Sequence, residues 1–537
     1  MPAGSVVEIH GGISQPYRQS QNGLYQIKII ANGSEERPIF FRGSSLNNKP
    51  IFDMDIQVQG QYIIIENIFL DSISERHDVK LATRQDGVHQ SLNHAAIRHS
   101  EFNRRLRTGG SQIGIGTSGD NSVFNIVIYN NSIYNAGDWQ LPPEFGDSDG
   151  QGIGVDPQAE HVWILDNEIY YCSGNAVQIN GGNDAPVDSP NYIYIGRNRV
   201  HHNRQSGLWT KGANDVIFSE NILWGHRSTS AGGWGHGGGI GWQYYPRRVW
   251  VLFNHVYDNS KGIATGSAGG EDYYIIGNRI YDILEAGIRF YSNPTIDIIG
   301  NTIYNAFDGI KIDGGATAPF NAYNNIIANV SNRHIDVVEG AASDLSIVNN
   351  NLFYQQDGAI NIWWDSSSYD LLGFQGIGKG INCIEANPLF VDAANNDFHL
   401  QPASPAIDNG TLSDVYQTFS NLYGIDISVD FDGSPVPQGF APDIGAYEYV
   451  LDPQSIPYSQ AVPYMQDFSL GKPTGSQGWE YYSNNEGRIE VVGGRLRMDD
   501  TSDNSTFSQN EAILHVDLTG KTNVTLTLDH WSLGDES

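Results

Sequence analysis

Residue types that act as acids, bases and cations recur at one position of a short repeated strand. Most copies of the strand begin with glycine, as in Gly152-Ile-Gly-Val-Asp156 and Gly309-Ile-Lys-Ile-Asp313. The fifth position carries, in successive copies, Asp156, Asn180, Lys211, Gln243, Gly266, Tyr291 and Asp313. A carboxyl group can give or take a proton, and a lysine can neutralise an anion. This row therefore holds the residue types that proton transfer requires.

The third position of the same strand adds further cations and an aromatic ring. It reads, in the same order, Gly154, Gln178, Trp209, Gly241, Ala264, Arg289 and Lys311. Positions two and four are apolar or Thr, so the period of two predicts that positions three and five face outward. If successive copies are neighbouring strands ~4.8 Å apart, then Asp156, Asn180 and Lys211 form a line of ~10 Å, about one or two sugar rings long.

Two long insertions enter this strand, one over residues 135–149 and the other over residues 226–238. Their acids, bases and rings include Trp139, Glu144, Asp149, His226, Arg227 and His236. Long loops on one side of a rigid scaffold commonly carry function. We therefore expect a cleft over residues 152–245.

Hydrolysis of a glycosidic bond is the chemistry that we favour for this cleft. It requires two carboxyl groups, ~5–5.5 Å apart in retaining enzymes and ~6.5–9.5 Å apart in inverting ones. We expect Asp156 on the rigid strand to act with Glu144 or Asp149 from the loop. The residues expected to bind substrate, with the tryptophans stacking on sugar rings, are Trp139, Asn180, Trp209, Arg227, Gln243, Arg248, Arg289 and Tyr291.

β-Elimination by a polysaccharide lyase is the alternative. It requires a cation to neutralise a uronate carboxylate and a base to remove the proton at C5. The candidates for these roles are Lys211, His226, Arg227, His236 and Arg248. The acids and tryptophans of the loops favour hydrolysis. The nearby cations favour an acidic substrate, such as a sulfated fucan or a uronate polymer such as alginate.

A second repeat shows which elements position these residues. A short motif contains a fixed Asn that is usually followed, three residues later, by an aromatic residue or His. Its Asn falls at Asn131, Asn167, Asn198, Asn221, Asn254, Asn278, Asn301, Asn325 and Asn351, with a basic period of about 24 residues. A coil of this size cannot bury its own apolar face, but stacked coils can. The Asn residues would then bond to one another in a ladder. We predict an all-β fold, a right-handed parallel β-helix.

These repeats, with the closing segments 387–392, 397–408 and 443–449, resemble the right-handed parallel β-helix superfamily of polysaccharide-degrading enzymes, which includes lyases and glycoside hydrolases such as fucanases. The resemblance covers roughly residues 40–450 and implies the fold, but it does not choose among chemistries. Lys211 followed by Arg227 is similar to the cation pair of alginate and chondroitin lyases. Asp156-Pro157 resembles the Asp-Pro of mannuronan epimerases, which implies a catalytic role for Asp156, and Gly-His236-Gly resembles polygalacturonases.

The chain divides into four segments. Residues 1–40 are the N-terminal cap and first strands, and 41–450 the catalytic β-helix. Residues 451–463 are a linker. Residues 464–537 alternate like antiparallel strands and resemble the start of a β-sandwich accessory module, which we expect to be truncated at Ser537.

The net charge of −31 argues against nucleic acid as a partner, and no apolar run is long enough to cross a membrane. We expect a secreted monomer whose export signal has been removed, with Cys172 and Cys383 as buried thiols. No metal site is evident in the catalytic region. A structural calcium ion could bind at residues 426–432 or 499–503. A non-catalytic carbohydrate-binding protein is the remaining class.

Overall fold

The computed structural model divides into two compact units, Met1–Glu448 and Tyr449–Ser537. It describes residues 1–11, 20–21, 24–71, 79–81, 84–85, 88–89, 91–103, 109–116, 122–140, 150–182, 189–227, 236–266, 270–291, 295–313, 319–338, 345–450, 460–461, 466, 468, 472, 479–483, 487–492, 495–500, 510–514 and 516–517.

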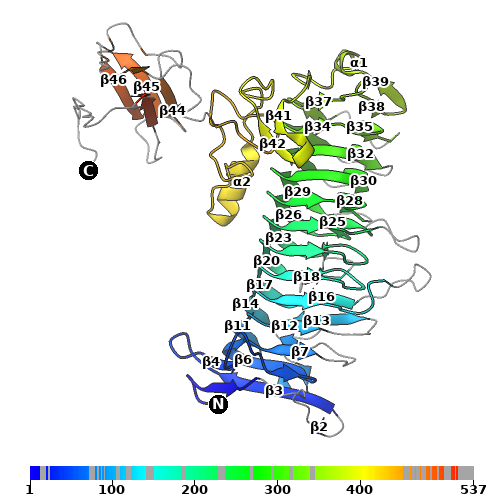
Figure 1. Ribbon diagram of the computed structural model, residues 1–537, viewed down its shortest axis with the longest axis vertical. Helices are drawn as coiled ribbons and strands as arrows, with labels where there is room; N and C mark the ends of the chain where they lie inside the picture. The colour runs from blue at the N-terminus through cyan, green and yellow to red at the C-terminus, as the bar shows by residue number, and fades with distance from the viewer. Residues whose placement is uncertain are drawn as a thin grey trace. The chain divides into compact units, whose positions relative to one another are not determined.

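The first unit is a stack of coils, and each coil adds one strand to each of three parallel sheets (Figure 1). The first sheet contains the glycine-led strands of the sequence repeat. Its strands are β8 (Val79–Leu81), β13 (Gly110–Ile115), β16 (Gly150–Val155), β19 (Val177–Asn180), β22 (Leu208–Lys211), β25 (Gly238–Gln243), β28 (Lys261–Thr265), β35 (Arg333–Val337) and β38 (Ile362–Trp364).

The second sheet follows the first along each coil. Its strands are β1 (Val6–Ile9), β4 (Ile39–Gly43), β11 (Leu92–Arg98), β14 (Val123–Tyr129), β17 (Ala159–Leu165), β20 (Asn191–Gly196), β23 (Asn214–Ser219), β26 (Arg247–Leu252), β29 (Glu271–Ile276), β31 (Ile296–Ile299), β33 (Phe320–Tyr323) and β36 (Ile347–Asn349).

The third sheet comes just after the ladder Asn. Its strands are β5 (Ile51–Phe52), β7 (Phe69–Asp71), β12 (Glu101–Asn103), β15 (Ser132–Tyr134), β18 (Glu168–Tyr170), β21 (Arg199–His201), β24 (Ile222–Trp224), β27 (His255–Tyr257), β34 (Ile326–Ala328), β37 (Leu352–Tyr354) and β40 (Ile384–Glu385).

Three long strands bend from one sheet into another, and β3 pairs with the first of them. They are β6 (Asp55–Glu66), β30 (Arg279–Tyr291) and β32 (Thr302–Asp313), and β3 spans Leu24–Asn32. The smaller elements are β2 (Ser20–Gln21), β9 (Arg84–Gln85), β10 (Val88–His89), β39 (Ser367–Tyr369), α1 (Leu371–Gly376), β41 (Phe390–Asp392), the 3-10 turn η2 (Ala393–Asn395), β42 (Asp397–Leu400) and α2 (Asp414–Tyr423).

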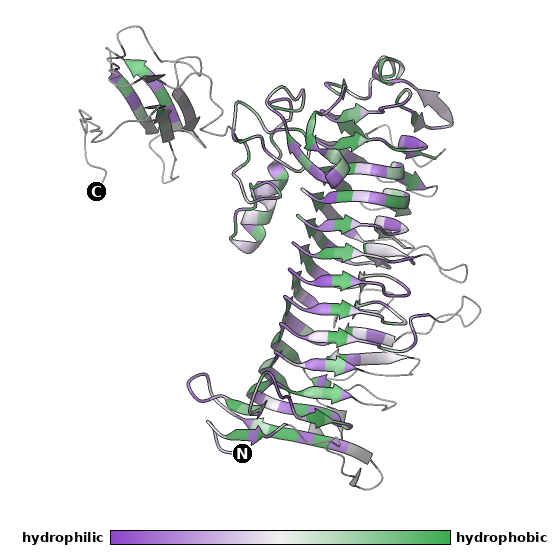
Figure 2. Cartoon of the chain, viewed as in Figure 1, coloured by the Kyte–Doolittle hydropathy of each residue, from purple (hydrophilic) through white to green (hydrophobic). Residues whose placement is uncertain are grey.

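The core lies inside the stacked coils and is made of apolar rows, one row from each inward position. In the first sheet the inward residues Ile153, Val155, Val177, Ile179, Leu208, Ile240 and Ile263 are fully buried. Figure 2 shows hydrophobic residues recurring at the same place along the stacked strands. The prediction that positions two and four face inward is confirmed, and positions three and five therefore face outward.

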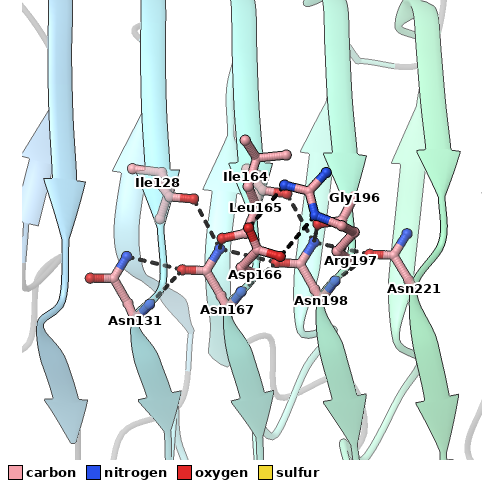
Figure 3. A network of polar contacts seen from close by, with 10 residues as sticks. All are labelled: Ile128, Asn131, Ile164, Leu165, Asp166, Asn167, Gly196, Arg197, Asn198 and Asn221. Atoms are coloured by element: carbon pink, nitrogen blue, oxygen red, sulfur yellow. Dashed lines mark hydrogen bonds and ion pairs between the residues drawn. The ribbon is translucent and has the colours of Figure 1, made fainter.

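The asparagine ladder predicted from the repeat is present at the turn between the second and third sheets (Figure 3). Asn167 donates from both its backbone nitrogen and Nδ2 to Oδ1 of Asn198, at 2.9 and 3.0 Å, and Nδ2 also donates to the carbonyl of Ile128. The same pattern links consecutive ladder residues from Asn131 to Asn351. The ladder satisfies backbone groups that would otherwise be buried without partners.

Each ladder Asn follows a residue in the left-handed region, with φ between +51° and +65° from Asn130 to Asn350. Non-glycine residues disfavour this conformation. The ladder bonds offset that cost, and neighbouring left-handed residues also pair with one another. Arg197, for example, donates Nε and Nη2 to the two carboxylate oxygens of Asp166, both at 2.9 Å (Figure 3).

The outer face of the third sheet carries a stack of aromatic rings that accounts for the aromatic residues of the repeat. The parallel rings in order are Tyr134, Tyr170, His201, Trp224, Tyr257 and Tyr281, with centroids 4.4–5.8 Å apart. This spacing matches the distance between coils. Because the rings cover one another's faces, the stack stabilises the coils.

Helix α2 covers part of the outer face of the second sheet. Ser413 caps its N-terminus, accepting from the backbone nitrogen of Val415, and Gly424 ends it in the left-handed conformation. Phe419 packs edge-on against Trp250 at 4.8 Å. With α2 on the second sheet and the aromatic stack on the third, the outer face of the first sheet remains as the polar face of these coils.

In the second unit the structure describes β43 (Gln460–Ala461), β44 (Trp479–Ser483), β45 (Gly487–Val492), β46 (Arg495–Asp500), β47 (Asn510–Leu514) and β48 (Val516–Asp517). Strands β44 and β47 are antiparallel, as are β45 and β46. This agrees with the predicted small antiparallel module. Most of the predicted linker lies outside the described residues.

Both cysteines are free thiols buried in the coils. Cys383 occupies the ladder position in the coil that follows Asn351, the last ladder Asn. The backbone nitrogen of Asn351 donates to its Sγ at 3.4 Å. Among the described residues, no helix is both long and apolar enough to span a membrane.

Candidate functional site

The outer face of the first sheet brings the predicted row together in register. Asn180 pairs with Lys211 and Lys211 with Gln243 on successive coils. The third-position row runs beside it, from Lys80 through Gly114, Gly154, Gln178 and Trp209 to Gly241. The predicted register of Asn180 and Lys211 is therefore confirmed, and Asp156, which follows β16, is hydrogen-bonded to Asn180.

Asp156 follows β16 directly, at the corner where the first sheet ends. Burial raises the pKa of its carboxyl group above the usual value, while Lys80 and a hydrogen bond from Asn180 act in the opposite direction. A carboxyl group in such surroundings keeps its proton to higher pH than an exposed one. Asp156 is therefore suited to proton transfer, as an acid or as a base.

Lys211 ends β22 and is paired with Asn180 on the neighbouring coil. Its side chain is partly buried and forms no ion pair or hydrogen bond with other described residues. Lys80 lies on the opposite side of Asp156, two coils earlier. An acidic group bound over Asp156 would therefore meet a lysine on either side.

Farther along the same face, the cations are neutralised in what we call the charge network. Lys261 and Arg289 pair with Glu285, both at 3.3 Å, and Arg289 pairs with Asp313 at 2.6 Å. Lys311 pairs with Asp308 and Asp336, and Arg333 with Asp336. Arg289, predicted to bind substrate, thus has its charge already compensated.

Trp209, predicted to stack on a sugar ring, is only 3% exposed. Its ring lies so close over Gly241 that a Cβ built on that glycine would be 2.2 Å from Cζ3 of Trp209. Its Nε1 donates to Oε1 of Gln243 at 3.2 Å. A ring covered in this way offers no free face for stacking, so the prediction for Trp209 is wrong. Gln243 faces outward as predicted and holds the indole in place.

His226, predicted as a catalytic base, is completely buried within a second polar ladder. Its Nδ1 donates to Oδ1 of Asn259 at 2.9 Å, and its Nε2 accepts from Nδ2 of Asn203 at 3.2 Å. Burial lowers the pKa of the ring to about 3. The catalytic assignment is wrong because this neutral imidazole takes the place of an Asn in the turn and cannot meet a substrate.

Arg227 and Arg248, predicted to bind substrate beside Lys211, lie elsewhere. Arg227 pairs with Asp258 at 2.6 Å, at the corner after the third sheet. Arg248 lies on the second sheet, where Nε and Nη2 donate to the carboxylate of buried Asp215 at 2.6 and 2.5 Å. The assignment of Arg248 is wrong, because sequence proximity to the loop does not place a residue on the first sheet, whereas the role of Arg227 stays a prediction.

Two other predicted residues lie near the corner between the third and first sheets. Trp139 stacks on Tyr171 with ring centroids 4.6 Å apart, so one face of its indole is occupied. His236 lies two residues before the start of β25, and its carbonyl accepts from Nζ of Lys261 at 2.8 Å. Their roles remain predictions. Glu144, Asp149 and the side chain of Tyr291 lie outside the described residues.

Four polar residues on or just beneath this face were not predicted from the sequence. Lys80 was missed because its coil is irregular in the repeat. Gln178 stood at the third position but was not selected, and the buried amides of Gln151 and Asn175 bond to it. Their polarity at buried positions was the available signal.

Within the described ranges, no group of three or more His, Cys, Asp or Glu side chains is arranged to hold a metal ion. The calcium ion at residues 426–432 or 499–503 stays a prediction. Near the first of these positions, Glu448 and Asp430 accept backbone N–H groups, and burial raises the pKa of Glu448 to about 8.

The family model for the right-handed β-helix region matches residues 151–323 and 234–374. The chain folds as a right-handed parallel β-helix. This agrees with the handedness of nearly all parallel crossover connections. It also confirms the resemblance to the β-helical superfamily that the repeats indicated.

Several solved structures are similar to this chain at low identity. Pectate lyase Pel9A is 13% identical, with 84% of this chain and 89% of that chain covered and a TM-score of 0.39. A mannuronic acid specific polysaccharide family 6 lyase from human gut microbiota is 12% identical, with 72% and 87% covered and a TM-score of 0.43. An alginate lyase from Paenibacillus sp. str. FPU-7 is 12% identical, with 59% and 93% covered and a TM-score of 0.36. No curated protein matches the chain.

Proposed function

We propose that this protein is a secreted polysaccharide depolymerase that cleaves a uronate-containing polymer by β-elimination on the outer face of the first sheet. The observation that carries the proposal is Lys211, which pairs with no carboxylate among the described residues and shares this face with Asp156 in a chain of net charge −31. An uncompensated lysine in so acidic a protein is suited to hold an anionic group.

The chemistry follows from these two side chains. The Lys211 ammonium neutralises the uronate carboxylate, which makes the C5–H more acidic. Asp156 in its ionised form is the candidate to take that proton, and its raised pKa makes it a stronger base than an ordinary aspartate. Electrons from the broken C–H bond form the C4–C5 double bond, and the glycosidic oxygen leaves from C4 and takes a proton from water or from the newly protonated Asp156.

Hydrolysis is the second candidate, and the raised pKa of Asp156 favours it too, because a protonated carboxyl group can serve as general acid. Hydrolysis also requires a second carboxyl group. The predicted partners Glu144 and Asp149 lie outside the described residues.

A product assay separates the two reactions. Alginate, polygalacturonate, a glucuronate polymer and a sulfated fucan are incubated with the protein, and reducing ends and the ultraviolet absorbance of unsaturated uronate are read together. Elimination predicts that both rise in parallel on a uronate polymer. Reducing ends without absorbance would refute elimination in favour of hydrolysis, and no product from any polymer would refute both.

Variants then test the residues. We expect Lys211→Ala to lower kcat/KM by roughly 100-fold or more, the usual effect of removing one group that stabilises developing charge. Lys211→Arg should retain part of the activity. Lys49→Ala, which removes a lysine between β4 and β5, is the matched control and should change little.

A further inference from the structure

Three amide side chains beside Asp156 form a network whose orientation can be deduced from one backbone group. The backbone nitrogen of Asn175 donates to Oε1 of Gln151 at 2.7 Å, and a backbone N–H can only be a donor. This fixes Nε2 of Gln151 on the other side, where it donates to Oε1 of Gln178 at 3.3 Å. Nδ2 of Asn175 donates to the same oxygen at 2.9 Å.

The network leaves the amide nitrogen of Gln178 as an outward donor. Oε1 of Gln178 accepts two hydrogen bonds, whereas its Nε2 forms none with the described residues. Gln151 and Asn175 are 5% and 4% exposed, and Gln178 is partly exposed. Two buried amides thus hold one accessible amide in a single orientation. Buried polar groups are costly unless they are bonded, and here the bonds set the direction of a surface group.

The position of Gln178 places this donor within the candidate site. On neighbouring coils Gln178 is paired with Gly154 and Trp209, and it lies two residues before Asn180, which bonds Asp156. Residues two apart on one face of a strand are about 6.6 Å apart. Gly154 has no side chain that could compete for the amide on the Asp156 side.

We propose that Nε2 of Gln178 donates a hydrogen bond to the carboxylate of the uronate being cleaved, and that Gln151 and Asn175 are positioning residues that fix this donor. The inference rests on the proposed elimination and adds the group that selects uronate over neutral sugars. A carboxylate only accepts hydrogen bonds, so the fixed N–H of Gln178 orients the carboxylate that Lys211 neutralises. Its charge grows as C5 loses its proton, so the bond is strongest in the transition state.

The decisive variant is Gln178→Glu. A glutamate can still accept both bonds from Gln151 and Asn175, so the fold is retained, but it has no N–H donor and repels a carboxylate. We expect kcat/KM on the uronate polymer that the wild-type protein cleaves to fall by more than 100-fold. Gln178→Ala should lower it by roughly 10- to 100-fold, the usual effect of losing a hydrogen bond to a charged group, mainly through kcat. The matched control is Gln417→Glu on the exposed surface of α2, which should stay within twofold.

The positioning role is tested with Asn175→Asp. An aspartate cannot donate to Oε1 of Gln178 and its carboxylate repels that oxygen, so the Gln178 amide should lose its single orientation. We expect a loss similar to that of Gln178→Ala, with no further loss in the double variant. Additive losses would indicate a general structural effect and would overturn the positioning role.

The outcomes separate the two proposals. If the wild-type protein forms unsaturated product but Gln178→Glu remains within twofold of it, the role of Gln178 is refuted and the elimination stands. If the wild-type protein forms no unsaturated product from any uronate polymer, the elimination is refuted and this inference with it.

Discussion

Acid should destabilise the folded protein through His226. The ring is completely buried and its pKa is lowered from 6.5 to about 3, mainly by burial. As the pH falls below 6.5, the unfolded chain binds a proton that the folded chain cannot accept. Stability therefore falls with falling pH until about pH 3, where the folded ring is protonated as well. This is the expected direction for a histidine held neutral by its surroundings.

The magnitude follows from the size of the shift. Each pH unit between the two pKa values costs about 1.4 kcal/mol, so at about pH 4.5 the loss from this one histidine is about 2.7 kcal/mol relative to neutral pH. His255 and His334 have lowered pKa values for the same reason and add to the loss in the wild-type protein. A variant is therefore needed to isolate His226.

His226→Asn is that variant, because both ladder neighbours of His226 are Asn. The free energy of unfolding is measured by urea titration at neutral pH and at about pH 4.5 for the wild type, His226→Asn and a control, His10→Asn, which changes an exposed histidine. We expect the variant to lose about 2.7 kcal/mol less on acidification than the wild type, and the control to behave like the wild type. If His226→Asn loses as much as the wild type, the buried-ring argument is refuted. Activity of His226→Asn at neutral pH should be retained, since the ring does not reach the first sheet's outer face.

Three further predictions concern stability, each read from urea titrations. Asn198→Ala removes bonds to Asn221 and to the carbonyl of Ile164 and leaves the backbone nitrogen of Asn167 without its acceptor, so we expect a loss of roughly 3–5 kcal/mol, against little change for exposed Asn421→Ala. Gly241→Ala places Cβ 2.3 Å from the backbone oxygen of Ala264 and 2.2 Å from Trp209, so we expect the free energy of unfolding to fall by roughly 1–3 kcal/mol. The control Gly376→Ala, where the new Cβ has no atom within 4 Å, should be neutral. Equal effects of the two changes would contradict the packing argument. Cys383→Asn should extend the ladder and stabilise the chain by about 1 kcal/mol, and a destabilised variant would show that the turn there cannot hold an amide.

The fold could be predicted because each coil carries the same short sequence motif. A ladder Asn must bond the Asn of the next coil, and the left-handed residue before it fixes the turn, so both recur at the same spacing in the sequence. The period of two in the glycine-led strand gave the inward and outward positions correctly. The aromatic residue three positions after the ladder Asn was visible too, but its role in a stack of rings is seen only when the coils are aligned.

The site was predicted less completely, for a different reason. Asn180 and Lys211 were placed correctly because they lie on regular strands, where the period of two and the strand register fix which residues are neighbours. Residues in turns and insertions were not, since a turn can point a side chain into the coil or onto another sheet. His226 was assigned to catalysis because its type suits that role, yet its place in the turn makes it a ladder residue.

The distribution of charge along the first sheet explains why chemistry is expected at one end of its outer face. In the charge network, four cations, Lys261, Arg289, Lys311 and Arg333, are matched by four carboxylates, Glu285, Asp308, Asp313 and Asp336. A bound anion would have to break these pairs, and uncovering a buried carboxylate such as Asp336 is costly. Around Asp156, by contrast, Lys80 and Lys211 exceed the described carboxylates by one charge, and no ion pair must break for Lys211 to bind an anion. An acidic polymer therefore gains most over coils 154–211, where Gln178 offers its fixed donor, and the network beyond serves mainly to hold the coils in register.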